Sequence, residues 1–279
     1  MIHESRRSVE QVAQVTALTL PSIAWPVANH LTLYHRLGKR WFDATAAAFG
    51  LLVTSPLLVI CAVAVWLDSP GPIFFRQHRI GKRRKPFEIV KFRTMVHRER
   101  GSGPKITAEG DTRITTVGKW LRKTKLDELP QLFNVLKGEM SLVGPRPEVP
   151  EYVAFYDADQ MRVLAFKPGV TGPASLAYID EEKLLAAAPD KEAFYLNVLM
   201  PRKIGLDLWY CERASLVEDL RLIFATLAKL FSATSWPASI PASPPMAPAF
   251  ELSKPQRLSD ISLDNQQGVL SSHRPRRNY

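Results

Sequence analysis

One long apolar stretch, residues 41–67, has the sequence WFDATAAAFGLLVTSPLLVICAVAVWL and decides the fold of the N-terminal part. It is long enough to cross a bilayer as a helix, because about 20 apolar residues suffice. Ser55-Pro56 lies in its middle, where a proline removes a backbone hydrogen bond and bends the helix. The Ser55 hydroxyl can bond a carbonyl that Pro56 leaves without a partner. We therefore expect a membrane-associated helix that is broken at Ser55 and Pro56.

Both ends of this stretch carry positive charge. Arg36, Lys39 and Arg40 precede it, and it is followed by Arg76, Arg79, Lys82, Arg83, Arg84 and Lys85. Positively charged flanks tend to stay on the cytoplasmic side of a membrane. A re-entrant helix, which enters the bilayer, bends and returns to the same side, satisfies both flanks and is the topology that we favour. A helix that crosses the membrane and a buried core helix are the alternatives.

The overall composition indicates one medium-sized domain with an anionic partner. The chain has 279 residues, 46% of them hydrophobic, and a formal net charge of +10. This charge suits an anionic membrane face, a phosphorylated substrate or nucleic acid. Nucleic acid is the poorest of the three, because the chain has no recognisable reader motif and its cations are spread among apolar segments. The two cysteines, Cys61 and Cys211, predict neither a disulfide framework nor a zinc site.

The chain divides into three parts. Residues 1–33 are of mixed composition with two prolines, and we expect a flexible N-terminal segment. Residues 34–231 form the predicted domain, with the re-entrant membrane helix at 41–67. Residues 232–279 are rich in Pro, Ser and Ala. Such a segment buries too little apolar area to offset the entropy of ordering it, so we expect a disordered tail.

Within the domain, the pattern predicts an α/β fold that is mainly helical with a small sheet. Residues 73–79 and 87–95 are expected as strands around the basic turn 82–85, with loops at 144–147 and 167–172. Helices are expected after residue 114 and over 150–165, 191–199 and 215–231. The last of these begins with Ser215 and Glu218 in capping-box spacing. We expect one of its faces to pack on the domain core, rather than on a membrane, through Leu216, Leu220, Ile223, Phe224, Leu227 and Leu230.

The clearest candidate for chemistry lies in residues 121–132, LRKTKLDELPQL. Pro130 fits the first turn of a helix, which places Asp127 near the N-cap. In the simplest interpretation Asp127 is only a cap and Glu128 a solvated first-turn acid. In the functional one, the positive helix end and Arg122 keep Asp127 ionised beside a phosphate. An ionised aspartate can attack phosphorus to give an acyl phosphate, while Mg²⁺ offsets the repulsion between the two anions.

Several cations stand singly among apolar residues instead of forming one solvated run, namely Lys91, Arg93, Arg113, Lys119, Arg122 and Arg146. Arg146 lies between two prolines, a rigid setting that suits bidentate contact with a phosphate. Any one of these cations can be an ordinary surface charge, but the set indicates an anionic ligand. The basic turn 82–85 differs from them and is expected to face anionic lipid headgroups or solvent.

These residues lie within a longer series of matching segments. The chain resembles the bacterial sugar transferases, the small monotopic phosphoglycosyl transferases that are also called polyprenyl-phosphate glycosylphosphotransferases. The resemblance covers most of residues 35–228. It includes Lys39-Arg40, Phe42-Asp43, Ser55-Pro56, Ser69-Pro70-Gly71-Pro72, Phe75, Gln77, the segment 79–81, Lys91-Phe92-Arg93-Thr94-Met95, and the segments 111–115, 126–132, 134–141, 143–147 and 168–172.

The resemblance implies a specific reaction. Family members move a sugar phosphate from a UDP-sugar to undecaprenyl phosphate with Mg²⁺, in a ping-pong scheme that releases UMP. Asp127 aligns with the nucleophile that becomes covalently modified. Glu128 completes the dyad and is expected to help with metal or acceptor. Arg122, Arg146, Lys91 and Arg93 are the expected phosphate-binding residues, and Ser55-Pro56 aligns with the break in the re-entrant helix.

The resemblance also implies a cellular setting. The enzyme would sit in the bacterial inner membrane with its catalytic domain in the cytoplasm. It would start the assembly of exopolysaccharide, capsule, O-antigen or a glycan that downstream glycosyltransferases extend. About forty residues precede the membrane helix, so we expect the minimal form of the family. The alternative is a non-catalytic membrane adaptor of polysaccharide assembly, whose basic face binds lipid and whose Asp127-Glu128 pair only caps a helix.

One loop departs from the family pattern. Many members carry an aromatic or small residue and then a glutamine after the segment that ends in Thr171-Gly172, whereas this chain has Pro173-Ala174-Ser175. For this loop we therefore transfer no sugar or uridine contact from the family.

Overall fold

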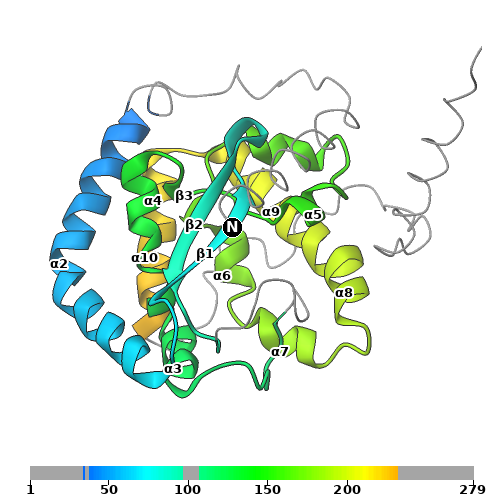
Figure 1. The fold of residues 1–279 in the computed structure, drawn as a ribbon. Coiled ribbons are helices and arrows are strands. Elements are labelled where there is room, and N and C mark those ends of the chain that lie inside the picture. The colour runs from blue at the N-terminus through cyan, green and yellow to red at the C-terminus, as the bar shows by residue number, and fades with distance from the viewer. Residues whose placement is uncertain (1–33, 35–37, 97–106, 232–279) are drawn as a thin grey trace, which may run out of the picture.

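The computed structural model describes residue 34 and residues 38–96 and 107–231. The predicted flexible segment 1–33 and the predicted tail 232–279 lie outside the described residues. Figure 1 shows one long helix, α2, along one side of a domain built mainly of short helices, with a strand hairpin crossing its face. The predicted mainly helical fold with small sheets is confirmed.

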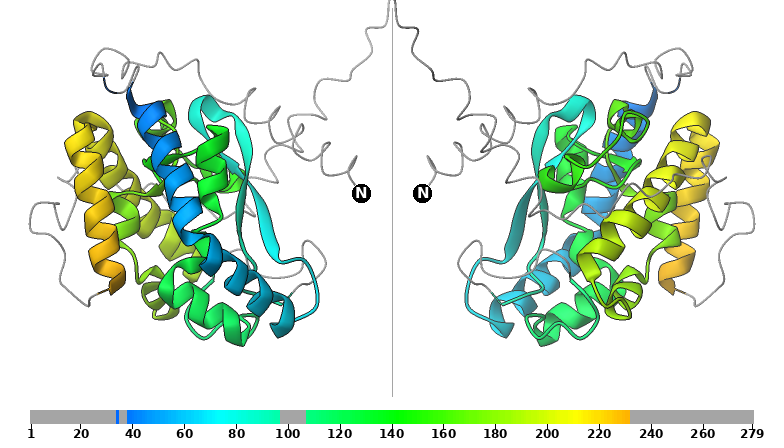
Figure 2. Two further views of the ribbon diagram at one scale, coloured as in Figure 1. Left: turned by 90° about the vertical axis from the view of Figure 1, so that its left-hand side faces the viewer. Right: turned by 90° about the vertical axis from the view of Figure 1, so that its right-hand side faces the viewer.

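Helix α2 (Lys39–Asp68) is a single helix of 30 residues with Pro56 inside it. Its hydrogen-bond ladder loses one bond, because Pro56 has no N–H for the carbonyl of Leu52 four residues earlier. The Ser55 hydroxyl donates to that same carbonyl at 2.8 Å, as we expected. Figure 2 shows α2 changing direction along its length. The predicted break is therefore a bend within a continuous helix, since Ser55 keeps the Leu52 carbonyl bonded.

One face of α2 packs on the domain and the other is apolar and exposed. Ala47, Cys61 and Val65 are buried, together with Asp43. The outward face carries Trp41, Phe49, Leu52, Val53, Val59, Ile60, Val63, Trp66 and Leu67. By length and composition α2 could cross a membrane. An apolar face of this size is consistent with membrane association, and it does not fit a buried core helix.

The strand hairpin pairs β1 (Phe74–Ile80) with β2 (Pro86–Phe92) in antiparallel register, from Phe74 opposite Phe92 to Ile80 opposite Pro86. The two predicted strands are thus confirmed. The basic turn between them contains a short 3₁₀ helix, η3 (Lys82–Arg84). Inward-facing Phe87 and Ile89 pack with Ala47 of α2 and Val135 of α4 (Gln131–Lys137), which joins the hairpin to the long helix.

The middle of the chain forms α3 (Thr116–Thr124), η4 (Leu126–Glu128), α4 (Gln131–Lys137) and β3 (Ser141–Val143). Strand β3 pairs in parallel with β4 (Gly169–Thr171). A Cβ on Gly169 would lie 2.1 Å from the backbone nitrogen of Gly144, so only glycine fits this crossing. We had placed β4 in a loop, because three residues are too few to show strand alternation.

The C-terminal half consists of α5 (Pro150–Val153), η5 (Gln160–Ala165), α6 (Pro173–Ala177), α7 (Glu181–Ala186), α8 (Lys191–Phe194), the π turn η6 (Tyr195–Leu199), α9 (Met200–Arg213) and α10 (Leu216–Phe231). The predicted helix 150–165 is not continuous. The structure has α5 at the start of this range and the 3₁₀ helix η5 at its end, and the residues between them are not helical. The predicted helix 191–199 continues through η6 into α9, which we did not predict. Residues of these elements, among them Tyr152, Leu196 and Ile204, build the largest apolar core.

Helix α10 begins as predicted, with the Ser215 hydroxyl accepting the Glu218 N–H at 3.2 Å. The predicted packing face is wrong. Leu222 is buried, whereas most of the expected stripe is exposed, namely Leu216, Leu220, Phe224, Leu227 and Leu230. The periodic pattern was correct, but an apolar stripe does not distinguish a protein core from another apolar surrounding. Figure 2 shows α2 and α10 on the same side of the molecule.

A buried polar cluster joins the first turns of α2 and α10. Lys39 Nζ lies 2.7 Å from Asp219 Oδ2 and 3.1 Å from Asp43 Oδ1. Tyr34 donates to Asp219 Oδ2 at 2.7 Å, and Tyr210 donates to Asp219 Oδ1 at 2.5 Å. Both oxygens of Asp219 thus have partners. We call these five residues the Asp219 cluster.

Candidate active site

A sharp turn presents Asp127 and Glu128. Helix α3 ends at Thr124, and Lys125 follows in the left-handed conformation with φ 57°. The chain then makes the 3₁₀ turn η4 before Pro130, and α4 begins at Gln131. Asp127 is therefore not the N-cap of α4 that we expected. The left-handed Lys125 and the extra 3₁₀ turn, which the sequence pattern did not reveal, separate it from the helix.

Asp127 is buried, with 8% of its surface exposed. Among the described residues, no group forms a hydrogen bond with its Oδ1 atom. A buried carboxylate oxygen normally has a partner, because leaving it unsatisfied costs free energy. The same side chain lines an open cleft. A buried oxygen without a hydrogen bond among the described residues, in a side chain that lines a cleft, indicates that Asp127 Oδ1 interacts with a bound ligand.

Glu128 has the opposite environment. Its Oε1 atom accepts from Lys91 Nζ at 2.6 Å and from Arg146 Nη2 at 3.1 Å. Lys91 comes from β2 and Arg146 from the loop after β3, so three separate segments meet here. We call Lys91, Asp127, Glu128 and Arg146 the dyad cluster.

The two carboxyl groups of this cluster have pKa values that are shifted in opposite directions. Burial alone would raise the pKa of Glu128, but Lys91 and Arg146 outweigh it and hold that pKa well below its usual range. Burial raises the pKa of Asp127, and the negative charge of Glu128 raises it further. Burial and Glu128 therefore have a larger effect on this pKa than Lys91, Lys125 and Arg122, which lower it, and the net result is a pKa of about 6.

The structure separates the remaining predicted phosphate-binding residues. Arg122 lines the cleft, where its Nη2 pairs with Glu182 of α7 and its Nη1 lies 3.3 Å from Thr94 Oγ1. Arg93 does not join the dyad cluster. Its guanidinium donates to the carbonyls of Val65, Ser69 and Pro70, at 3.2, 2.5 and 2.8 Å. These carbonyls lie at the C-terminal end of α2, so the side chain binds the helix end instead of facing the dyad cluster.

Sequence reasoning missed Asp207, on α9. This side chain is fully buried, and its Oδ2 accepts the backbone N–H of Arg146 at 3.1 Å. Burial raises the pKa of Asp207 to about 7. The contact fixes the loop that carries Arg146. No signal in the sequence pointed to it, because α9 itself was not predicted.

The dyad cluster lies in an open cleft with a volume of about 2120 Å³. Two cations that face one carboxylate can also bind phosphate oxygens, which are similar acceptors. The neighbouring Asp127 carboxyl can then act on the bound group as a nucleophile. The geometry suits chemistry on a phosphate ester or diphosphate.

Comparison with known proteins agrees with this geometry. The family model described as bacterial sugar transferase matches residues 34–233. A UDP-glucose:undecaprenyl-phosphate glucose-1-phosphate transferase of Caulobacter vibrioides is 40% identical over 207 residues, which cover 70% of this chain and 70% of the relative. The enzyme of the same name from Escherichia coli K12 is 38% identical over 71% of this chain and 41% of its own length.

A third relative differs in its sugar. It is a UDP-N-acetylgalactosamine-undecaprenyl-phosphate N-acetylgalactosaminephosphotransferase of Aeromonas hydrophila, 38% identical over 70% of this chain. The chain spans 44% of the length of that relative. These matches confirm the resemblance that the sequence motifs indicated. The chain belongs to the bacterial sugar transferase family.

Proposed function

We propose that this protein transfers a sugar-1-phosphate from a UDP-sugar to undecaprenyl phosphate through a covalent phosphosugar intermediate on Asp127. The products are UMP and a lipid-linked diphosphate sugar, which later glycosyltransferases extend into a polysaccharide or glycan. Family membership supports the proposal, as do the Caulobacter and E. coli relatives, whose names give UDP-glucose and undecaprenyl phosphate as substrates. The Aeromonas relative acts on UDP-N-acetylgalactosamine, so the family covers more than one donor sugar.

The observation that carries the proposal is the contrast between the two adjacent carboxyl groups. Glu128 is held as an ion by Lys91 and Arg146. Asp127 Oδ1 is buried, and the described residues offer it no hydrogen bond. A helix cap, as the adaptor hypothesis requires, would use its oxygens on backbone N–H groups. Neither η4 nor α4 has a side-chain cap of this kind.

The reaction follows from these roles. The phosphates of the donor bind to Lys91, Arg146 and Arg122. For this contact Arg122 leaves its ion pair with Glu182. An oxygen of Asp127 attacks the phosphorus that bears the sugar, and the bond from this phosphorus to UMP breaks. A phosphate oxygen of the acceptor then attacks the same phosphorus, and the bond to Asp127 breaks. The carboxylate is thereby regenerated and the sugar phosphate is left on the lipid.

Mg²⁺ fits this site as an ion that the donor helps to hold. Among the described residues no group of three or more His, Cys, Asp or Glu side chains gathers as a metal site. Mg²⁺ is commonly bound through one or two carboxylates and substrate phosphates, so Asp127 and Glu128 together with the diphosphate supply suitable ligands. When bound, the ion offsets the negative charge of the diphosphate.

The membrane part of the proposal is a re-entrant α2 in the bacterial inner membrane, with the catalytic domain in the cytoplasm. The positive flanks of α2 and its bend near Pro56 support this topology. Single cysteines placed before Arg36 and after Arg84 are expected to react with an impermeant maleimide from the same side of the membrane. Labelling from opposite sides would establish a helix that spans it.

Trapping the intermediate tests the chemistry. The purified protein is incubated with a panel of UDP-sugars without acceptor and digested for mass spectrometry. We expect a phosphosugar on the peptide that contains Asp127, and none in Asp127→Asn. Undecaprenyl phosphate should remove the adduct and yield lipid-linked product. Product without any adduct on Asp127 would reject the nucleophile, and neither adduct nor product with any donor would favour the adaptor.

A further inference from the structure

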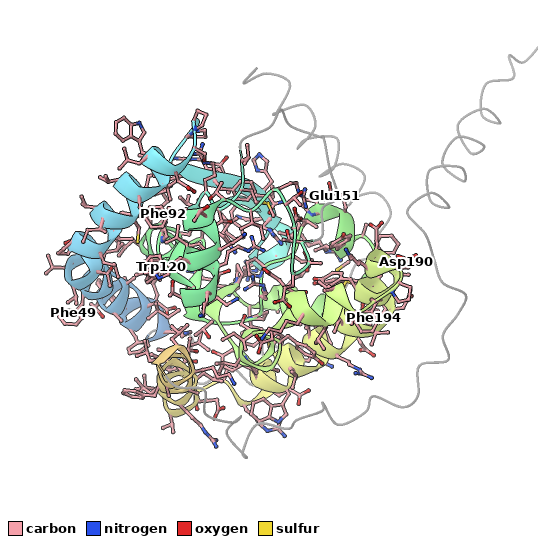
Figure 3. All side chains as sticks on the ribbon, turned by 90° about the horizontal axis from the view of Figure 1, so that it is seen from below. Phe49, Phe92, Trp120, Glu151, Asp190 and Phe194 are labelled. Atoms are coloured by element: carbon pink, nitrogen blue, oxygen red, sulfur yellow. The ribbon has the colours of Figure 1, made fainter. Side chains whose placement is uncertain are left out.

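The catalytic cleft extends into an apolar groove between α2 and α10. Phe42, Ala46 and Phe49 line it on the α2 side, and Ile223, Phe224 and Leu227 line it on the α10 side. We call this part of the cleft the α2–α10 groove. Figure 2 shows helices α2 and α10 side by side, and Figure 3 shows the Phe49 side chain projecting outward from α2. Neither wall contributes a charged side chain to the cleft lining among the described residues.

Two strand residues line the bottom of the groove, and an ion pair joins its two walls at one end. Leu142 of β3 and Val170 of β4 line the same cleft between the two helices. At the start of both helices, Lys39 and Asp219 form their 2.7 Å ion pair. The walls are thus held together at one end, and Leu129, Leu132 and Asp127 line the same cleft as the groove residues. The cleft is therefore continuous from an apolar region to the dyad cluster.

This arrangement matches an amphiphile with a phosphate at one end and a long hydrocarbon chain at the other. The cations Lys91 and Arg146 suit the phosphate, and the groove suits the chain. We propose that the α2–α10 groove binds the polyprenyl chain of the acceptor and guides its phosphate to Asp127. The inference rests on the proposed function for the identity of the acceptor. It assigns a binding role to the α10 face that we had expected to pack on the core.

The occupant follows from the continuity of the cleft. An ordinary bilayer lipid would cover the exposed faces of α2 and α10 wherever they meet the membrane. Only a chain attached to the reacting phosphate gains from a groove that ends at the dyad cluster. Filling the groove should therefore impair the step that uses the acceptor and spare the step that uses the donor.

Ala46→Trp fills the groove, and Ala48→Trp is its matched control. Ala48 is exposed on the same helix and does not line the cleft. Each variant is assayed in nanodiscs with undecaprenyl phosphate, with a short water-soluble geranyl phosphate, and without acceptor for the single burst of UMP. For Ala46→Trp we expect at least a tenfold loss of kcat/KM with the long acceptor. The short acceptor and the UMP burst should change less than twofold, and Ala48→Trp should resemble the wild type. Leu227→Trp repeats the test from the opposite wall.

Wild-type turnover of the long acceptor in both groove variants would overturn the inference. So would equal losses with both acceptors, or an equal loss in Ala48→Trp. Absence of UMP release from the wild-type protein would instead reject the proposed function.

A binding experiment tests the groove without turnover. A polyprenyl phosphate with a diazirine in its chain is photolysed with the wild-type protein, and the labelled peptides are mapped by mass spectrometry. We expect labels on the peptides of Phe42 to Phe49 and Ile223 to Leu227. Labels elsewhere would overturn the inference. So would labelling that excess phospholipid suppresses as well as unlabelled undecaprenyl phosphate does, since the groove would then hold bilayer lipids.

Discussion

The Asp219 cluster and the dyad cluster are both buried groups of carboxylates and cations, but they differ in how fully they are paired. In the Asp219 cluster both oxygens of Asp219 have partners, and Lys39 bonds two carboxylates. In the dyad cluster Glu128 is paired, whereas Asp127 Oδ1 has no hydrogen bond among the described residues. The first cluster ties α2 to α10, and the second lines a cleft.

This difference separates a structural cluster from a reactive one. A fully bonded polar cluster stabilises one arrangement of the chain. Removing one member leaves its former partner as a buried charge without an ion-pair or hydrogen-bond partner. A buried atom without a partner costs stability, and among the described residues Asp127 Oδ1 is such an atom in a side chain that lines a cleft open to a ligand. The number of unmet hydrogen bonds, rather than burial or charge alone, distinguishes the two sites.

The largest expected effect comes from Asp127→Asn. We expect the rate of lipid-linked product formation to fall by at least about a thousandfold, because the amide cannot act as the nucleophile. The melting temperature should stay constant or rise, because no hydrogen bond to Oδ1 is lost among the described residues. Product formation and thermal unfolding of the purified protein measure both effects. A clear loss of stability would place Asp127 with the structural cluster.

Asp219→Ala should show the reverse pattern. Its removal leaves Lys39, Tyr34 and Tyr210 without their shared acceptor, and breaking a buried ion pair costs about 3 kcal/mol. We expect a much lower melting temperature, with a UMP burst per folded molecule that stays within about twofold of the wild type. Asp219→Asn, which keeps one acceptor oxygen, should lie between the two. A lost burst at unchanged stability would contradict the structural role.

Asp207 gives a pH test of the same comparison, because its Oδ1 also lacks a hydrogen bond among the described residues. Its pKa in the folded protein is raised to about 7 by burial, above that of an unfolded aspartate. The folded state therefore holds this proton more tightly, and stability from this group is full at low pH and is lost as the pH rises toward 7.

The test compares Asp207→Asn with the wild type in thermal unfolding from pH 5 to pH 8. The variant should gain about 2 kcal/mol relative to the wild type over this range, because it has no charge to bury. A constant difference between the two proteins would show that Asp207 does not titrate in this interval.

The smallest expected effect is that of Ser55→Ala. The variant removes the hydroxyl that donates to the Leu52 carbonyl, which Pro56 leaves without an N–H partner. Side-chain hydrogen bonds within membranes contribute about 0.6 kcal/mol on average, so we expect a fall in melting temperature of about 2 °C. Thr54→Val is the control, because the Gly50 carbonyl that loses the Thr54 hydroxyl keeps its helical N–H partner. Equal shifts in both variants would show that Ser55 does not compensate for Pro56.

Sequence reasoning succeeded where the signal was local. The apolar run 41–67 and the strands on either side of the basic turn are visible as composition and alternation, and both form. The dyad and its cations were found through their residue types and family motifs. Lys91, Glu128 and Arg146 indeed come together.

The remaining features depend on contacts that no local pattern encodes. Arg93 lies two residues from Lys91, yet its guanidinium donates to carbonyls at the end of α2 and not to the dyad cluster. Lys125 adopts a left-handed conformation that shifts Asp127 away from the helix start. Glu182 and Asp207 lie on short or unpredicted helices, and only the folded chain brings them to Arg122 and to the Arg146 loop.

The contact of Arg93 with the end of α2 has a mechanical consequence. The last turn of α2, the helix that we propose enters the bilayer, is hydrogen-bonded to Arg93, which directly follows β2, the strand that carries Lys91. Tilting α2 to match a thicker or thinner bilayer is therefore expected to displace Lys91 relative to the dyad. The lipid composition of the membrane would then tune the reaction rate, as well as supply the acceptor.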